Sequence, residues 1–232
     1  MKVLVFDSSA LISLTINNLL NKLRELKKHY RGEFYITNEV EKEIVSTPIN
    51  NKKFKLEALQ IANFIANDNL KVYEEDLSNK TNYLLTLANS IYKAQDNYIQ
   101  ILQKGEVESL ALASMINADA LVIDERTTRL LIEDALKLKH LLEHKLHTKV
   151  TIDKDNLLYF KKETRNVKII RSSELMIIAF ELNLFENYDK VKNIIKDYKK
   201  ELLEGVLYGL RFNGCSISID EINNVLRFER IR

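Results

Sequence analysis

The chain has 232 residues, of which 46% are hydrophobic, and 35 Lys and Arg against 33 Asp and Glu give a formal net charge of +2. This balance excludes binding to nucleic acid by bulk positive charge, so a polyanion site must be a local patch. The single cysteine excludes an intrachain disulfide framework and a zinc ribbon and favours a reducing compartment such as the cytoplasm. We expect neither a signal peptide nor a membrane span, because Asp7 interrupts the apolar N-terminus and no long apolar run follows.

Short apolar runs predict the strands of a buried sheet. They are continuous and rich in β-branched and aromatic residues, as parallel strands covered on both faces are. These runs cover residues 2–6, 33–37 and 120–123, and a fourth strand is plausible at 167–170.

Helices are predicted between these strands from apolar residues at helical spacing, over residues 16–30, 54–65 and 84–102. Only five glycines and one proline punctuate the chain, which also favours helix with short connections. Strands that alternate with helices predict an α/β fold with a parallel sheet and right-handed crossovers.

The last part of the chain is predicted to be helical only. One apolar stripe runs from residue 191 to 210, and the spacing of Ser218 and Glu221 is that of a capping box at the start of a last helix. No linker rich in Pro, Gly or Ser precedes this tail. We therefore predict a sheet domain over 1–184 and a C-terminal helical extension over 185–232 that packs on it.

Acidic residues follow two of the predicted strands. Asp7 comes directly after the first strand, and Asp124 and Glu125 come after the third. Ligands of open parallel sheets bind outside the carboxyl ends of the strands, so these side chains would share one edge. For each acid alone, a turn residue or a helix N-cap is the alternative.

Two glutamates on predicted helices extend this set. Glu43 lies three residues after Val40 and therefore on the same helix face. Glu108 lies one turn before Leu112, and we take it as the site candidate of its helix, whereas Glu106 is a first-turn acid that the helix dipole favours. A solvated surface charge is the alternative for each glutamate.

Converging carboxylates imply a cation. At ~4 Å, one pair of like charges costs about 4 kcal/mol at an effective dielectric near 20. The carboxylates must then take up protons or bind a divalent ion, and oxygen ligands favour Mg²⁺ or Mn²⁺ over zinc. His140, His144 and His147 have a spacing that can bind zinc, but no cysteine lies nearby, so we do not favour a zinc site.

The ordered set of acids resembles the PIN-domain family, the metal-dependent nuclease fold of VapC-type toxins and RNA-processing enzymes. The resemblance covers residues 1–135 clearly and 167–184 more weakly. It departs from the family at the last acid, where Ile123-Asp124-Glu125 replaces Thr-x-Asp, and in length, since the helical extension looks like that of longer archaeal and bacterial PIN proteins. The segments that carry it are 3–12, 40–43, 105–108 and 121–126.

The resemblance implies a three-layer α/β/α fold around a central parallel sheet of four to five strands, plus C-terminal helices. It also implies an endoribonuclease that cleaves single-stranded RNA with Mg²⁺ or Mn²⁺ and leaves 5′-phosphate and 3′-hydroxyl ends. Ser9 would support Asp7, contact phosphate or cap the following helix. At the last position, either acid of the adjacent pair could be the ligand. The implied catalytic and metal-binding residues are Asp7, Glu43, Glu108, Asp124 and Glu125.

Basic residues predict where RNA would lie. Residues 137–171 contain ten Lys or Arg and four Asp or Glu, a local net charge of +6. We prefer Arg126 and Arg129 as phosphate contacts, since they follow the strand-end acids, and solvated surface charge is the alternative for any one residue. Further candidates from the basic stretch are Lys161, Lys162 and Arg165.

Other functions and partners are open from the sequence. A nuclease-inactive PIN-like scaffold that binds RNA or a protein is one. The four retained acid positions favour activity, whereas the Asp-to-Glu change at the last position favours its loss or retuning. A haloacid-dehalogenase-type phosphatase or a receiver domain also places an Asp after its first strand, but Asp7-Ser8-Ser9 lacks the second acid of Asp-x-Asp. A homodimer and a regulatory protein partner both stay open, and we expect no membrane partner.

Overall fold

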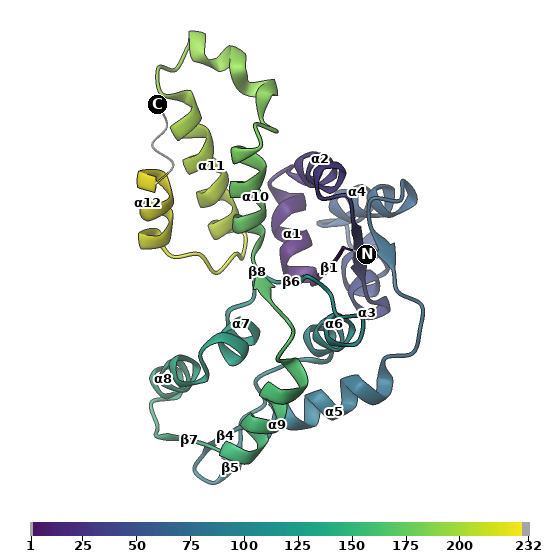
Figure 1. Cartoon of the computed structure of the whole chain (residues 1–232), viewed down its shortest axis with the longest axis vertical. Coiled ribbons are helices and arrows are strands. Elements are labelled where there is room, and N and C mark those ends of the chain that lie inside the picture. The colour runs from purple at the N-terminus through teal and green to yellow at the C-terminus, as the bar shows by residue number, and fades with distance from the viewer. Residues whose placement is uncertain (1, 229–232) are drawn as a thin grey trace.

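A computed structural model describes residues 2–228 and shows a central sheet with helices on both faces (Figure 1). The strand order is β3-β2-β1-β6-β8, and all neighbouring pairs are parallel. All five strands therefore end at the same edge of the sheet. Their bounds are β1 (Val3–Phe6), β2 (Glu33–Ile36), β3 (Lys71–Val72), β6 (Ala120–Val122) and β8 (Ile169–Ile170).

Alternation along β1 explains the layers. Leu4 and Phe6 lie in one hydrophobic core, and Val3 and Val5 lie in the other. The three-layer α/β/α fold with a parallel sheet and C-terminal helices is thus confirmed. The first core is covered by α1 (Ser8–Ile16), α2 (Leu20–Tyr30), α4 (Lys55–Ala66) and α10 (Ser172–Glu181). The second core is covered by α5 (Ser78–Ala88), α6 (Lys104–Met115), α7 (Arg126–Glu133), α8 (Ala135–Leu146) and α9 (Lys154–Thr164).

Short irregular elements complete the sheet domain. After β2, α3 (Asn38–Glu41) continues into a π-helical turn, η1 (Lys42–Ser46), and then η2 (Pro48–Asn50). A second, antiparallel sheet has the order β5-β4-β7. Its strands are β4 (Tyr92–Ala94), β5 (Asn97–Tyr98) and β7 (Val150–Ile152).

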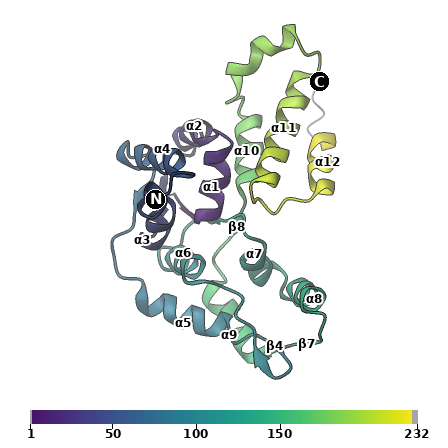
Figure 2. The ribbon, with the colours of Figure 1, turned by 180° about the vertical axis from the view of Figure 1, so that it is seen from behind.

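The C-terminal helices stand beside α10 in both views (Figures 1 and 2). Leu203, Leu207 and Ile222 are buried in the same hydrophobic core as α1 and α10. The division into domains 1–184 and 185–232 stays a prediction, and its ends, residue 1 and residues 229–232, lie outside the described chain. The elements are η3 (Glu186–Asn193), α11 (Tyr198–Phe212) and α12 (Ile219–Phe228).

Several predicted helices need correction. Residues 16–30 are not one helix, because the chain breaks at Asn18, which has a φ of 57°. Residues 84–102 are helical only to Ala88, after which β4 and β5 form a hairpin. At its turn Gln95 and Asp96 have φ values of 49° and 65°, the left-handed pair that a tight hairpin requires.

The tail also differs in part from the prediction. The apolar stripe of residues 191–210 is divided between η3 and α11. The capping box of the last helix is present, because the Glu221 N–H donates to Ser218 Oγ at 3.1 Å and the Ser218 N–H donates to Glu221 Oε2 at 2.8 Å. Between residues 2 and 228, no helix has the length and apolarity needed to cross a bilayer.

Candidate active site

Asp7 lies at the junction of β1 and α1. It is the N-cap of α1, and only 2% of its surface is exposed. Its Oδ2 accepts hydrogen bonds from the Ser9 N–H at 3.0 Å and the Ser9 hydroxyl at 2.6 Å. Burial raises the pKa of Asp7 to about 6, and the charge of Glu43 adds to this rise while the bonds from Ser9 oppose it. Ser9 therefore supports Asp7 and fixes one of its oxygens.

Glu43 reaches the same edge from the π-helical turn η1. Such single turns of wider helix often lie at functional sites. The Glu43 side chain is exposed, and its Oε2 would lie 3.6 Å from a Cβ placed on Gly105. The carboxylate of Glu43 thus lies over the first turn of α6.

Glu106, on that first turn of α6, joins these two acids. Its Oε2 accepts the Gln103 N–H at 3.0 Å in a capping box. Burial raises the pKa of Glu106 to about 7, against the Gln103 hydrogen bond, and the charges of Glu125, Asp7 and Glu43 raise it further. We call Asp7, Glu43, Glu106 and Glu125 the acid cluster.

Glu125 enters the cluster from the edge of the sheet. It is the N-cap of α7, and its Oε2 accepts the Thr128 N–H at 2.7 Å. It adds a fourth element to the site, after β1, η1 and α6. Its charge is one of those that raise the pKa of Glu106.

Asp124, next to Glu125, has a different role. It is fully buried, and its Oδ1 and Oδ2 accept the N–H and the hydroxyl of Ser172 at 2.8 and 2.6 Å. Both oxygens are therefore engaged in holding the first turn of α10. Of the two acids after β6, Glu125 is the one that lies in the acid cluster.

Glu108 is not brought into the acid cluster. It lies two residues after Glu106, a rotation of about 200° around the helix. Its Oε2 is buried and has no hydrogen-bond partner among the described residues. The sequence favours Glu108 over Glu106, whereas in the structure it is Glu106 on which the charges of the other acids act. The signal for Glu106 was its first-turn position three residues after Gln103.

The donor set of the acid cluster fits Mg²⁺ or Mn²⁺. All donors are carboxylate oxygens, which hard divalent cations prefer. Burial and mutual repulsion raise the pKa values of Asp7 and Glu106, and a cation would relieve this repulsion. As the side chains stand in residues 2–228, no three His, Cys, Asp or Glu groups are close enough together to hold one ion.

The predicted basic residues fall into two groups. Arg126 is exposed beside Glu125, and Arg129 forms an ion pair with Glu133 at 3.1 Å. The other group lies on or just after α9, which both views show well below the C-terminal helices (Figures 1 and 2). Its members, Lys161, Lys162 and Arg165, are all exposed.

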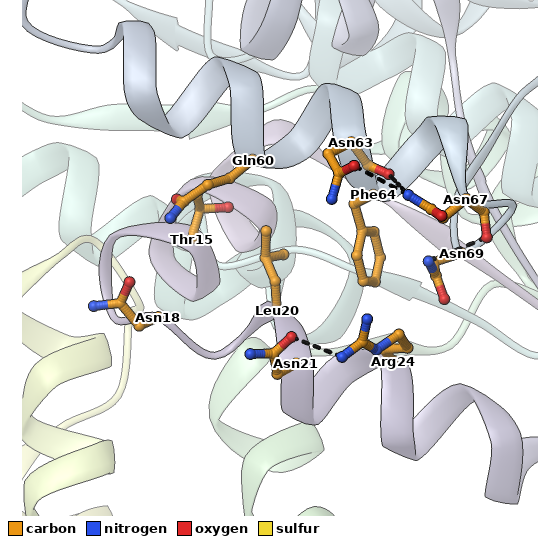
Figure 3. Close-up of a pocket in the computed structure, with 10 residues that line it drawn as sticks. All are labelled: Thr15, Asn18, Leu20, Asn21, Arg24, Gln60, Asn63, Phe64, Asn67 and Asn69. Atoms are coloured by element: carbon orange, nitrogen blue, oxygen red, sulfur yellow. Dashed lines mark hydrogen bonds between the residues drawn. The ribbon is translucent and has the colours of Figure 1, made fainter.

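A polar pocket of about 160 Å³ lies between α1, α2 and α4 (Figure 3). It is near the C-terminal end of α1, whereas Asp7 caps the N-terminal end. Two of its amides bond to each other, since Asn67 Nδ2 donates to Asn63 Oδ1 at 3.1 Å. No acidic residue lines this pocket, so it offers no carboxylate ligands for a metal ion.

The matched family agrees with the geometry of the site. A family model, DUF3368, described as a PIN domain, matches residues 3–140. That range contains all four members of the acid cluster. No curated protein and no solved structure matches significantly.

Proposed function

The chain belongs to the PIN-domain family, and from that premise we propose that it is a metal-dependent endoribonuclease that cleaves phosphodiester bonds of single-stranded RNA. PIN domains are generally nucleases and typically use divalent metals. The observation that supports the proposal is the acid cluster, in which carboxylates from three other elements near the carboxyl edge of a parallel sheet raise the pKa of Glu106.

The residues of the acid cluster and Ser9 have different roles in this proposal. Asp7, Glu43, Glu106 and Glu125 are the groups that would hold Mg²⁺ or Mn²⁺. When bound, the ion would lower the pKa of the attacking water and neutralise charge on the phosphate. Ser9 keeps Asp7 in one orientation through two hydrogen bonds. The fixed orientation of Asp7 favours catalysis, because a side chain that must reorient during the reaction loses part of its catalytic effect.

The experiment that tests this function is cleavage of a labelled single-stranded RNA in Mn²⁺ by wild type and Asp7→Asn. We expect Asp7→Asn to abolish cleavage while circular dichroism shows an intact fold. Asp96→Asn removes a carboxylate from the exposed hairpin turn and should cleave like wild type. Undiminished cleavage by Asp7→Asn would refute the assignment of the acid cluster.

The inactive scaffold is the alternative that this experiment separates. Wild type that binds RNA but does not cleave it with Mn²⁺ or Mg²⁺ would favour the scaffold. Membership of the PIN-domain family removes the basis for the phosphatase and receiver alternatives, which rested on Asp7 alone. A homodimer, a regulatory protein partner and a cytoplasmic location stay predictions.

A further inference from the structure

A cleft of about 790 Å³ separates α7 and α8 from the C-terminal end of α11 and the start of α12. Figure 2 shows these two pairs of helices facing each other across the loop that joins α11 to α12. Residues 212–218 of this loop and its borders lie beyond the matched residues 3–140. The C-terminal extension therefore supplies one whole wall of the cleft.

The cleft is strongly basic. Arg126, Arg129, Lys137 and Arg211 line it against a single acid, Glu221. That acid forms an ion pair with Arg171 at 2.9 Å, so its charge is already compensated. Two of the cations, Arg126 and Lys137, are exposed and form no ion pair with another described residue. The cleft has a positive charge that the protein itself leaves unmatched, which fits a polyanionic ligand.

The cleft begins where the acid cluster ends. Arg126 directly follows Glu125 in the chain. Ser216, in the opposite wall, donates its N–H to the carbonyl of Asp124 at 3.2 Å. A strand whose phosphate lies at Glu125 would therefore have its next phosphates beside the cations of the cleft.

An aromatic side chain and unused polar atoms add to this charge. Phe212 lines the cleft with 79% of its surface exposed, and its ring stacks on that of Tyr208. Exposed aromatic rings beside cations are the surfaces on which unpaired bases stack. Arg129 Nε and Ser216 Oγ, in the walls, have no hydrogen-bond partner among the described residues.

We propose that this cleft binds single-stranded RNA as it leaves the acid cluster. The inference rests on the proposed function and adds the C-terminal extension to the substrate-binding surface. Arg126, Lys137 and Arg211 neutralise successive phosphates, and Phe212 stacks on a base. Charge and an exposed ring together favour RNA over an acidic protein segment, which would use the cations without needing the ring.

The test measures the binding of a fluorescein-labelled 12-nucleotide oligouridine to the full chain. Fluorescence anisotropy reports the binding, in EDTA and at salt concentrations between 50 and 200 mM. Arg126→Gln with Lys137→Gln removes two phosphate contacts. We expect the plot of the logarithm of the association constant against the logarithm of the salt concentration to become less steep by about 1.4. The affinity at 0.1 M salt should fall about 10–30-fold. Phe212→Ala should weaken binding about fivefold or more with an unchanged slope, because stacking releases no counterions.

The matched control is Lys190→Gln with Lys192→Gln, which removes the same charge from the exposed η3 segment at the far end of the extension. It should leave affinity and slope near wild type. A cleft variant that behaves like this control, with Mn²⁺-dependent cleavage intact, would overturn the cleft proposal and leave the ribonuclease standing.

Other outcomes separate the two proposals further. Wild type that binds RNA through the cleft but never cleaves it would support the cleft and end the ribonuclease proposal. Wild type that binds no RNA but binds polyglutamate, with binding lost in Arg126→Gln and Lys137→Gln, would overturn the cleft proposal in favour of an acidic protein partner. Absence of binding to either polymer would overturn it as well.

Discussion

Replacing Asp7 with Asn should make the metal-free protein more stable at pH 8. Burial is the first cause that raises the pKa of Asp7 from 3.8 to about 6. At 1.36 kcal/mol for each tenfold change in acidity, ionised Asp7 costs the folded state up to about 3 kcal/mol. Asparagine removes the charge and keeps an oxygen for Ser9, but its amide needs a partner of its own, so we expect a net gain of about 1–2 kcal/mol.

The pH dependence of this gain follows from the sign of the shift. The pKa of Asp7 is higher in the folded than in the unfolded chain, so the folded state binds more protons between pH 4 and 6. Wild type therefore loses stability as pH rises through that window. The advantage of Asp7→Asn should be complete above about pH 7, fall to about half near pH 5 and vanish below about pH 4.

Urea unfolding followed by circular dichroism in EDTA at pH 5 and pH 8 measures this effect. Asp124→Asn is the matched control one strand away, because it makes the same chemical change at a carboxylate whose oxygens both accept hydrogen bonds from Ser172. It should destabilise the protein by about 1–3 kcal/mol. The reasoning would be refuted if Asp7→Asn were no more stable than wild type at pH 8. It would also be refuted if the gain in the free energy of unfolding were the same at pH 5 and pH 8.

Three further predictions concern the cluster and the extension. Glu106→Gln should reduce Mn²⁺-dependent cleavage about 100-fold or more and Glu108→Gln less than about fivefold, and equal losses would contradict the placement of Glu106. Mn²⁺ at pH 8 should raise the melting temperature of wild type more than that of Asp7→Asn in a thermal-shift assay, because binding to the folded state alone stabilises it, and identical shifts would count against a metal site. Arg171→Gln should lower the free energy of unfolding by about 3 kcal/mol and speed limited proteolysis of the extension, because it removes a largely buried partner of Glu221. An unchanged rate of proteolysis would argue against this contact.

The sheet could be predicted because its strands are short, continuous and apolar. Continuous runs such as Val3–Phe6 have no solvent-facing residue, and their shortness and β-branched and aromatic residues favour a strand covered on both faces over a buried helix. The β4–β5 hairpin could not be found in this way. Ile91 and Tyr98 continue a helical spacing by coincidence, and the turn uses Gln95 and Asp96 rather than an Asn-Gly pair. Strand β3 has two residues, too few for any periodicity.

The sequence predicts which helices and strand ends carry the acids of the site. It does not predict which of two neighbouring acids on an element faces the site. That Asp7 and Glu43 belong together is implied by the resemblance to the PIN-domain family, and the helix after β2 agrees with it. The choice between Glu106 and Glu108 depends on which side of α6 faces β1. Periodicity gives no answer there, since Val107 and Ser109 are also buried and apolar or small residues surround the helix. The choice between Asp124 and Glu125 depended on Ser172, which is 48 residues away in sequence.

The adjacent acids after β6 connect the acid cluster to the C-terminal extension. Ser9 Oγ donates to Asp7 at 2.6 Å and accepts the N–H of Asp124 at 3.0 Å. The side chain of Asp124 holds the first turn of α10 through Ser172, and its carbonyl accepts the N–H of Ser216 in the wall of the cleft. Asp124 therefore links the serine that supports Asp7 both to α10 and to the loop between α11 and α12. Because these bonds join Ser9, Asp124 and Ser216 in one continuous chain, a shift of the loop at Ser216 would act on the residue that holds the Ser9 hydroxyl, and the wall of the cleft is thereby coupled to the support of Asp7.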